Sequence, residues 1–383
     1  MASIKLKGDT SGEVTIQAPA VAGTTTLNLP ATSSTLATQN ALGVRNLIIN
    51  GDMRIHQRGG TITAASATVY YGLDRFWGYA GTGQFSMEQS TDAPDNFLNS
   101  MKVTVTTVDS SMAAGDRYML SQPIEGLNVT HLDFGSSTAQ TVTLSFWVKS
   151  SITGTFGAVL INGNATRTYV KEYTINAANT WEKKTITIAG DTSGTWTYTN
   201  ALWGSVRFCL AAGSTYHGTD STWNAGNYIS TSNQTNLMAT SGATFYITGV
   251  QLEVGDTATP FEHRPYDMEL QRCMRYFVNA LSGTSDVYGV FALGQNNSST
   301  QVRCIFTTPV QMRIVPSLIY SGSFQATGGA GSKDVTSFAT SVRTGNNFME
   351  LLADTVSGGA LALGYMVRRK NDASAYFYLS AEL

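Results

Sequence analysis

Charge, cysteine and long apolar runs are all scarce in this chain, and each shortage excludes a class of protein. Only 13% of the 383 residues are charged, and 24 Lys and Arg stand against 26 Asp and Glu. A nucleic-acid partner, which needs a basic face, is therefore not expected. No run of about 18 apolar residues occurs and no apolar leader follows Met1, so neither membrane insertion nor Sec-dependent export is expected.

Cysteine and histidine are too few and too scattered to predict a disulfide framework or a metal site. The chain has three cysteines, Cys209, Cys273 and Cys304. Their number is odd and their neighbours are apolar, so we expect buried free thiols. The chain has four histidines without the spacing of metal ligands, His56, His131, His217 and His263. We therefore expect no metal and no cofactor.

Glycine is abundant, at 37 residues, and Thr, Ser and Asn separate short runs rich in Val, Ile, Tyr and Phe. This composition predicts an all-β protein of many short strands. The clearest strands in the central part are predicted at 46–55, 101–105, 142–148, 169–175, 185–188, 206–210 and 245–254. Those in the C-terminal part are predicted at 287–293, 302–308, 317–324, 348–353, 361–367 and 375–381, with a turn at 326–334.

These patterns divide the chain into three parts. Residues 1–44 contain three brief alternating apolar pairs, which predict a short N-terminal β segment that needs a partner surface. Residues 45–265 predict a β-sandwich of the jelly-roll type, because their strands alternate between one apolar and one polar face. Residues 266–383 predict a short linking helix followed by a C-terminal β-sandwich that forms the tip.

The stretch 245–266 is expected to close the central domain. Its apolar alternation slips by one residue at Gly249, which predicts a β-bulge, and Pro260 and Pro265 prevent the strand from continuing. Asp267 is expected to cap a helix directly afterwards. The apolar stripe of that helix is predicted at positions i, i+3, i+4 and i+7, namely Leu270, Cys273, Met274 and Phe277.

No arrangement for catalysis is evident in the sequence. The pentapeptide Gly-Asp-Thr-Ser-Gly occurs at 8–12 and 190–194, but a turn explains both copies and no His and Asp stand in order around them. The candidates for a glycosidase-like pair are Asp74, Glu88, Glu125, Asp133, Glu172 and Glu253, and the sequence favours none of them. The chain is therefore expected not to be an enzyme.

Aromatic residues crowd into 181–228 among Gly, Ser, Thr and Asn. Flat rings stack on the C–H faces of sugars while Asn and Thr bind hydroxyls, so a glycan site is one interpretation. The other interpretation is that the same rings fill the ends of the sandwich or a subunit interface. The candidate glycan-binding residues are Trp196, Tyr198, Trp203, Tyr216, His217, Trp223 and Tyr228, with Trp147 on the outer face of its strand.

Several motifs together resemble bacteriophage tail-fibre proteins with a jelly roll like that of carbohydrate-binding modules. The ordered set is NLIINGDMRIHQRGG (46–60), SFWVKSS (145–151), NTWEKKTITIAGD (179–191), TGVQLEVGDTATPFEHRP (248–265) and ELQRCMRYF (269–277). Residues 4–38 are similar to N-terminal fibre segments, and 307–322 resembles a motif of distal tip domains. Carbohydrate-binding modules often hold calcium through a Glu and an Asp, for which this chain has Arg54 and the region of Thr248 and Gly249. Arg54 would repel a cation, which argues against calcium there, and a site formed by Glu253 with backbone carbonyl oxygens is the alternative.

The resemblance implies a non-catalytic fibre or receptor-binding protein that attaches the virion to a host surface polysaccharide. It implies a homotrimer, phage tail proteins bound through residues 1–44, and a location in the virion after synthesis in the bacterial host cytoplasm. Two alternatives stay open at this point. One is a structural tail adaptor without a glycan site, and the other is a capsule-degrading depolymerase or deacetylase.

Overall fold

The computed structural model describes residues 3–7, 13–17, 45–65, 67–281, 286–329, 331–341, 343–356 and 364–383. The chain divides into two compact units, residues 1–43 and 44–383. In the first unit, β1 (Ser3–Lys7) and β2 (Glu13–Gln17) pair as an antiparallel hairpin, which confirms two of the three strands expected there. The third, at 27–29, lies outside the described residues.

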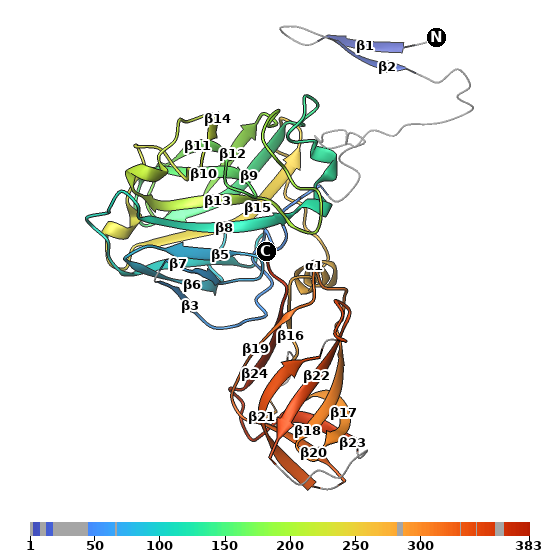
Figure 1. The fold of residues 1–383 in the computed structure, drawn as a ribbon. Helices are drawn as coiled ribbons and strands as arrows, with labels where there is room; N and C mark the ends of the chain where they lie inside the picture. The colour runs from blue at the N-terminus through green and yellow to red at the C-terminus, as the bar shows by residue number, and fades with distance from the viewer. Residues whose placement is uncertain are drawn as a thin grey trace. The chain divides into compact units, whose positions relative to one another are not determined.

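Two antiparallel sheets form the sandwich of the second unit (Figure 1). The seven-stranded sheet has the order β14 (Thr222–Ala225), β11 (Arg167–Ile175), β10 (Gly154–Asn162), β13 (Leu202–Ala212), β8 (Arg117–Glu125), β5 (Trp77–Ala80) and β4 (Val69–Tyr71). The six-stranded sheet has the order β12 (Glu182–Ile188), β9 (Val142–Ser150), β15 (Thr244–Val254), β7 (Ser100–Thr107), β6 (Gln84–Ser90) and β3 (Ile62–Ala64). The all-β class and the jelly-roll-like sandwich are confirmed.

Alternation along the strands builds the core between the sheets. On β9, Leu144, Phe146 and Val148 are buried against the opposite sheet, while Trp147 points the other way and is half-buried. Phe146 meets Phe208 of the facing sheet with ring centroids 4.9 Å apart. The period-two pattern in the sequence therefore located this strand and its inner face correctly.

The strand predicted at 46–55 is wrong, because these residues form an irregular loop. Side chains replace the ladder that a strand would use: Asn46 Oδ1 accepts from the Ile48 amide at 2.9 Å, and Asn50 Oδ1 accepts from the Ile55 amide at 2.8 Å. Asn50 and Met53 have φ of 60° and 59°, which a strand does not allow. Polar side chains thus satisfy this buried backbone in place of a neighbouring strand.

The C-terminal part differs from the expected sandwich, because its strands close into a barrel. The helix α1 (Tyr266–Met274) leads into a three-stranded sheet of β16 (Phe277–Asn279), β24 (Tyr376–Ser380) and β19 (Ser317–Ser321). The barrel contains β17 (Val290–Ser298), β18 (Gln301–Thr307), β22 (Phe348–Thr355), β21 (Gly331–Thr340), β20 (Phe324–Gly328) and β23 (Gly364–Arg369). Closure pairs every strand of the barrel on both sides, which an open sandwich does not achieve.

Two details of this part also correct the sequence interpretation. Pro265 precedes α1 without a side-chain cap, so Asp267 lies inside the first turn, and Phe277 belongs to β16 and not to the helix. Most of the turn expected at 326–334 belongs to β20 and β21. The three cysteines are buried and free, as predicted. Across the described ranges, no helix has the length and hydrophobicity that a membrane crossing requires.

A buried carboxylate joins the sandwich to the segment after α1. Glu125, at the end of β8, accepts from Arg275 Nε at 2.8 Å and from Arg275 Nη2 at 2.5 Å, and its Oε2 accepts from Tyr276 Oη at 2.6 Å. Burial alone would raise the pKa of Glu125, but the bonds from Arg275 and Tyr276 outweigh it and lower the pKa. The charged form therefore stabilises this junction.

We expect Glu125→Gln to lower the free energy of unfolding at neutral pH by about 1–3 kcal/mol, less than for a fully buried pair because Arg275 is partly exposed. Because the folded pKa is lowered, the contribution of Glu125 is fully present above pH 4.5 and is lost as the pH falls through the lowered value. The difference between the two proteins in urea unfolding should therefore shrink in acid. Lys370→Gln, which breaks an exposed pair with Asp334, is the control and should change little. Equal effects of the two substitutions would contradict this account of the junction.

Candidate functional site

The bulge predicted at Gly249 is present and forms the floor of a groove on the outer face of the six-stranded sheet. The pairing of β15 with β9 shifts register between Thr248 and Gln251, and Gly249 has φ of +61°. The Val250 amide then turns to the 46–55 loop, where it donates to Gly51 O at 2.9 Å. The bulge is confirmed, and the loop that replaced the expected first strand holds it in place.

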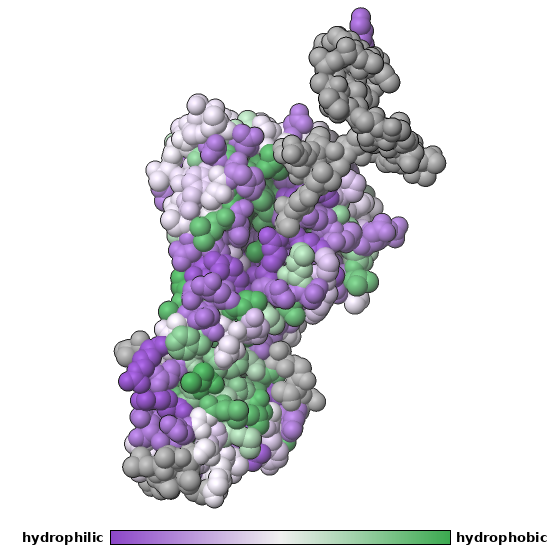
Figure 2. All heavy atoms as spheres, turned by 90° about the vertical axis from the view of Figure 1, so that its right-hand side faces the viewer, coloured by the Kyte–Doolittle hydropathy of each residue, from purple (hydrophilic) through white to green (hydrophobic). Residues whose placement is uncertain are grey.

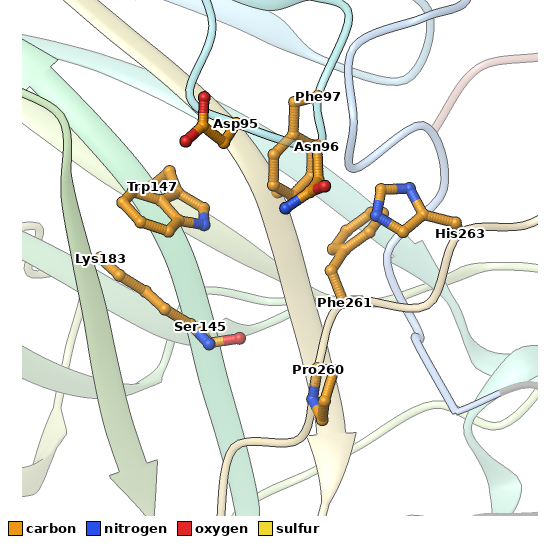
Figure 3. Close-up of a pocket in the computed structure, with 10 residues that line it drawn as sticks. Asp95, Asn96, Phe97, Ser145, Trp147, Lys183, Pro260, Phe261 and His263 are labelled. Carbon is orange, nitrogen blue, oxygen red and sulfur yellow. The ribbon is translucent and has the colours of Figure 1, made fainter. Parts of the chain in front are cut away.

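One wall of the groove consists of three aromatic rings (Figure 3). Phe97 and Phe261 meet with ring centroids 5.1 Å apart, and His263 lies 5.3 Å from Phe97 and 4.9 Å from Phe261. Phe97 comes from the loop between β6 and β7, while Phe261 and His263 come from the irregular segment 255–265 between β15 and α1, called the strap after β15 below. Two segments far apart in sequence thus build one apolar wall.

The other wall carries Trp147 of β9 and Lys183 of β12, which are direct cross-strand partners. An added Cβ at Gly249 would lie 2.7 Å from Phe97 Cζ and 3.0 Å from Trp147 Cδ1. Only glycine therefore leaves room for a ring on each side of the floor. Asp95 and Asn96, both exposed, stand at the rim of the groove, which has a volume of about 310 Å³.

A smaller hollow of about 190 Å³ shares Asn96, Phe97 and His263 with the groove and adds Asp52 and Arg54. Arg54 donates from Nε to Asp52 and from Nη2 to the Arg264 carbonyl oxygen at 2.7 Å. Burial raises the pKa of Asp52, although the adjacent Arg54 charge opposes that shift. The position expected from resemblance to hold a calcium ligand therefore carries a guanidinium.

A second row of side chains continues the face beyond the groove. Lys149 and Tyr246 are cross-strand partners, and Lys149 Nζ lies 4.4 Å from the Tyr246 ring centroid and 5.2 Å from that of Trp181. Trp181 Nε1 donates to Asp92 Oδ1 at 3.2 Å, and Lys149 also pairs with Asp92. The face therefore combines half-buried rings with hydrogen-bonding groups, an arrangement that suits a polar ligand with apolar faces.

Of the residues predicted to bind glycan, Trp147 is the one that lines this groove. The prediction is wrong for Trp203 and Trp196, which are 0% and 7% exposed and form part of the core. Both rings pack around Phe134, at centroid distances of 5.2 Å and 4.9 Å, and Trp196 Nε1 donates to the buried Asp191 at 3.2 Å. They fill the sandwich and present no ring face to a ligand.

The remaining candidates lie in two other places. Trp223 and Tyr198 are half-buried beside the Phe134 cluster, where Trp223 Nε1 donates to Ala189 O at 2.8 Å and Tyr198 Oη donates to Phe134 O at 2.9 Å. Tyr216, His217 and Tyr228 are half-buried in the loops that flank β14, near the outer face of the seven-stranded sheet. The structure thus divides the predicted cluster and places none of these five in the groove.

Four groove residues were not among the predicted site residues: Phe97, Phe261, His263 and Lys183. Lys183 could have been found, because it alternates outward on β12 with Ile186 and Ile188 facing the core. The three rings lie in loops, where no periodicity indicates which way a side chain points. In the part of the chain that the structure describes, no three His, Cys, Asp or Glu side chains converge as metal ligands.

The sequence matches no protein-family model and no curated protein. Among solved structures, it is similar to the enzymatically active domain of tailspike protein 4 of bacteriophage CBA120, with 12% identity and a TM-score of 0.29 over 55% of this chain and 21% of that one. It is also similar to the family 11 carbohydrate-binding module of Clostridium thermocellum in complex with a β-1,3-1,4-mixed-linked tetrasaccharide, with 14% identity and a TM-score of 0.27 over 52% of this chain and 100% of the module. TmCBM61 in complex with β-1,4-galactotriose matches with 10% identity and a TM-score of 0.27 over 55% and 100%. At TM-scores this low, these likenesses add no weight to the residues of the groove.

We expect Gly249→Ala to destabilise the protein by about 2–4 kcal/mol, because the methyl group meets two rings and the φ is unfavourable. The matched control is Gly242→Ala, which has φ of +72° and nothing within 4 Å of the added Cβ. It isolates the backbone cost of about 1–2 kcal/mol. Urea unfolding measures both, and equal losses would show that the rings do not crowd the bulge.

Proposed function

We propose that this chain is a non-catalytic phage tail fibre or receptor-binding protein that attaches the virion to a surface polysaccharide of the bacterial host. The observation that carries the proposal is the groove floored by Gly249, where Trp147 faces the Phe97, Phe261 and His263 rings across the bulge. Resemblance of the motifs at 46–60 and 248–265 to tail-fibre proteins supports the phage assignment.

A sugar unit would lie with its C–H face on Trp147 or on the opposite ring wall. Lys183 on the wall beside Trp147, and Asp95 and Asn96 at the rim of the same groove, would bind hydroxyl groups. A stacked ring contributes about 1 kcal/mol beyond its buried area, by analogy with aromatic pairs, so a single site is weak. Several copies acting together would convert weak binding into firm attachment.

An exposed apolar row on the barrel supports self-association as a homotrimer. Met366, Leu293 and Ile305 are direct cross-strand partners on β23, β17 and β18, and are 41%, 65% and 62% exposed. Figure 2 shows hydrophobic side chains gathered on one face of the C-terminal part. Contiguous apolar surface of this kind marks interaction sites, and symmetric association of copies would cover it.

Residues 1–44 would attach the assembled fibre to other phage tail proteins, and the protein would be made in the bacterial cytoplasm and reside in the virion. The β1–β2 hairpin is a short element that suits pairing with a partner surface. A structural adaptor and a polysaccharide-degrading enzyme are the competing functions. The binding experiment described next distinguishes both from a receptor-binding protein.

We expect Trp147→Ala to weaken binding to a surface polysaccharide about tenfold, because it removes one stacking wall of the groove. The measurement is binding of the purified chain to an array of bacterial surface polysaccharides, with thermal melting in parallel. Trp196→Ala is the control: that ring is core, so the substitution should cost about 3–5 kcal/mol of stability and lower binding only in proportion to unfolded protein.

The outcomes separate the three functions. If the wild type binds a polysaccharide and Trp147→Ala binds it equally well, the glycan site lies outside the groove. Binding to no polysaccharide on the array would favour the adaptor. Release of new reducing ends from a bound polysaccharide would show an enzyme and overturn the non-catalytic part of the proposal.

We expect Leu293→Asp with Ile305→Asp to shift the protein from trimer to monomer in sedimentation velocity, because charges cannot be buried unpaired in an interface. Val69→Asp is the control, since Val69 is exposed but lies on β4 of the sandwich. A wild-type protein that sediments as a monomer at micromolar concentration would contradict the homotrimer.

A further inference from the structure

The hollow of about 190 Å³ beside the Trp147 groove has no part in the site as proposed so far. Its lining shares Asn96, Phe97 and His263 with the groove and adds Asp52, Arg54 and Leu98. A single layer of side chains therefore separates the two spaces. Sites that enclose a whole ligand usually have volumes of about 300–1,000 Å³, so the hollow is too small for a separate site and is the right size for an extension of the groove.

Polar groups without partners line this hollow. Arg54 donates from Nε to Asp52 and from Nη2 to the Arg264 carbonyl oxygen at 2.7 Å, while its Nη1 bonds to no described residue. The Arg54 side chain is 19% exposed, and Nη1 is not sealed from solvent. The side chains of Asn96 and His263 are exposed, and within the described part of the chain they also form no hydrogen bond. Free donors and acceptors in an accessible hollow are what a ligand rich in hydroxyl groups requires.

Apolar groups stand beside these polar ones. Leu98 is 74% exposed, the largest value for a large hydrophobic side chain among the described residues, and Phe97 borders both the hollow and the groove. A sugar ring presents C–H groups on its faces and hydroxyl groups at its edge. The hollow therefore offers both kinds of contact that one sugar unit needs.

The walls of the hollow are fixed before any ligand arrives. Gln89 Nε2 donates to the Arg54 carbonyl oxygen at 3.1 Å, so both the backbone and the guanidinium of this arginine are held. Asn96 has φ of 70° in a turn closed by the Phe97 amide, which donates to Pro94 O at 3.1 Å. Positive φ outside glycine is costly and is concentrated at functional sites. Preorganised groups lose little freedom on binding, which favours recognition.

Formal charges balance in both spaces, which favours an uncharged sugar. The groove contains Lys183 and Asp95, and the hollow contains Arg54 and Asp52. An acidic sugar would meet a carboxylate in either place. A hydroxyl group, in contrast, can donate to a carboxylate and accept from a guanidinium, so it suits such a mixed lining.

We propose that the hollow is a second sugar subsite, which binds the unit next to the one in the Trp147 groove. Arg54 and Asn96 would bind the hydroxyl groups of this second unit, and Leu98 would contact its ring face. The inference rests on the proposed function, because it specifies that the chain recognises at least two linked, uncharged units of the host polysaccharide. Two units joined covalently occupy neighbouring subsites with an advantage that a single unit lacks.

The test uses the full chain and, as probes, the mono- and disaccharides released by partial hydrolysis of a polysaccharide that the array identifies. Titration calorimetry should show the disaccharide binding about tenfold more tightly than the monosaccharide. Leu98→Glu removes the apolar contact and places a carboxylate in the hollow with Arg54, so disaccharide affinity should fall about tenfold, to the level of the monosaccharide. Arg54→Lys keeps the charge beside Asp52 but loses the free Nη1 donors, and should weaken disaccharide binding about threefold or more.

The matched control is Leu127→Glu, which makes the same change at an exposed leucine outside both spaces and should bind the disaccharide like the wild type. Equal affinity of the wild type for the mono- and disaccharide would overturn the inference, as would wild-type disaccharide binding by Leu98→Glu. Acidic units in every polysaccharide that binds would overturn the choice of an uncharged sugar. These three results leave the groove and the proposed function standing, whereas an array that binds no polysaccharide overturns both.

Discussion

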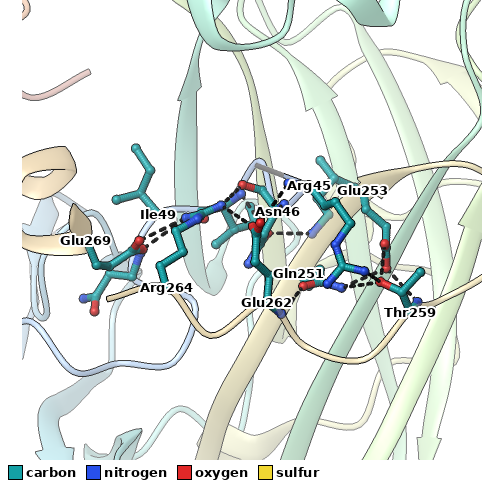
Figure 4. A network of polar contacts seen from close by, with 12 residues as sticks. Arg45, Asn46, Ile49, Gln251, Glu253, Thr259, Glu262, Arg264 and Glu269 are labelled. Carbon is teal, nitrogen blue, oxygen red and sulfur yellow. Dashed lines mark hydrogen bonds and ion pairs between the residues drawn. The ribbon is translucent and has the colours of Figure 1, made fainter. Parts of the chain in front are cut away.

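The guanidinium of Arg264 is the interaction on which the rest of the second unit depends (Figure 4). It is 6% exposed and donates to Ile48 O at 3.1 Å, to the carboxylates of Glu262 and Glu269 at 3.0 Å each, and to Asn46 O. It thereby joins the 46–55 loop, the strap after β15 and the first turn of α1. Removal of one partner from such a buried network costs about 3–5 kcal/mol, since the remaining charges stay out of water.

The ring wall of the groove follows from this network. Glu262 turns inward to Arg264, and its carboxylate also accepts from the Asn46 amide at 2.9 Å. Its neighbours Phe261 and His263 therefore point outward and meet Phe97. The same loop secures the floor, because Asn46 Nδ2 donates to Val250 O at 3.0 Å within the bulge. A polar network that touches no ligand thus sets both the floor and one wall of the candidate site.

Structural features that follow from regular periodicity and from glycine could be predicted from the sequence. Features that depend on partners distant in the sequence could not. The inner face of β9 could be predicted because apolar residues alternate regularly along it, and the bulge at Gly249 could be predicted because that alternation slips by one residue there. The strand β8 was missed: all but its first residue are buried, so alternation is absent, and it includes Pro123, which usually argues against a central strand. The carbonyl oxygen of Pro123 accepts a hydrogen bond from Arg75 Nη2 at 2.7 Å, and no local sequence pattern reveals this partner.

Aromatic density was a poor guide to the site for a related reason. Tryptophans close in sequence, such as Trp196 and Trp203, are also close in space, with ring centroids 4.4 Å apart, but their faces are used by each other and by Phe134. A ring can stack on a ligand only if one of its faces is exposed. Whether a face is exposed depends on the strand face or the loop from which the side chain projects. Trp147 meets this condition because its strand alternates outward, so strand phase predicted it where density failed.

Two places in the sandwich break local rules, and they differ in what compensates them. At Gly249 a central strand adopts a positive φ, and hydrogen bonds from the 46–55 loop satisfy the freed backbone within the protein. At Arg207 a half-buried cation keeps an unused Nε donor, and the described residues supply one ring and one amide but no carboxylate. The first deviation is complete in the folded chain and shapes a surface, whereas the second has no compensating carboxylate among the described residues.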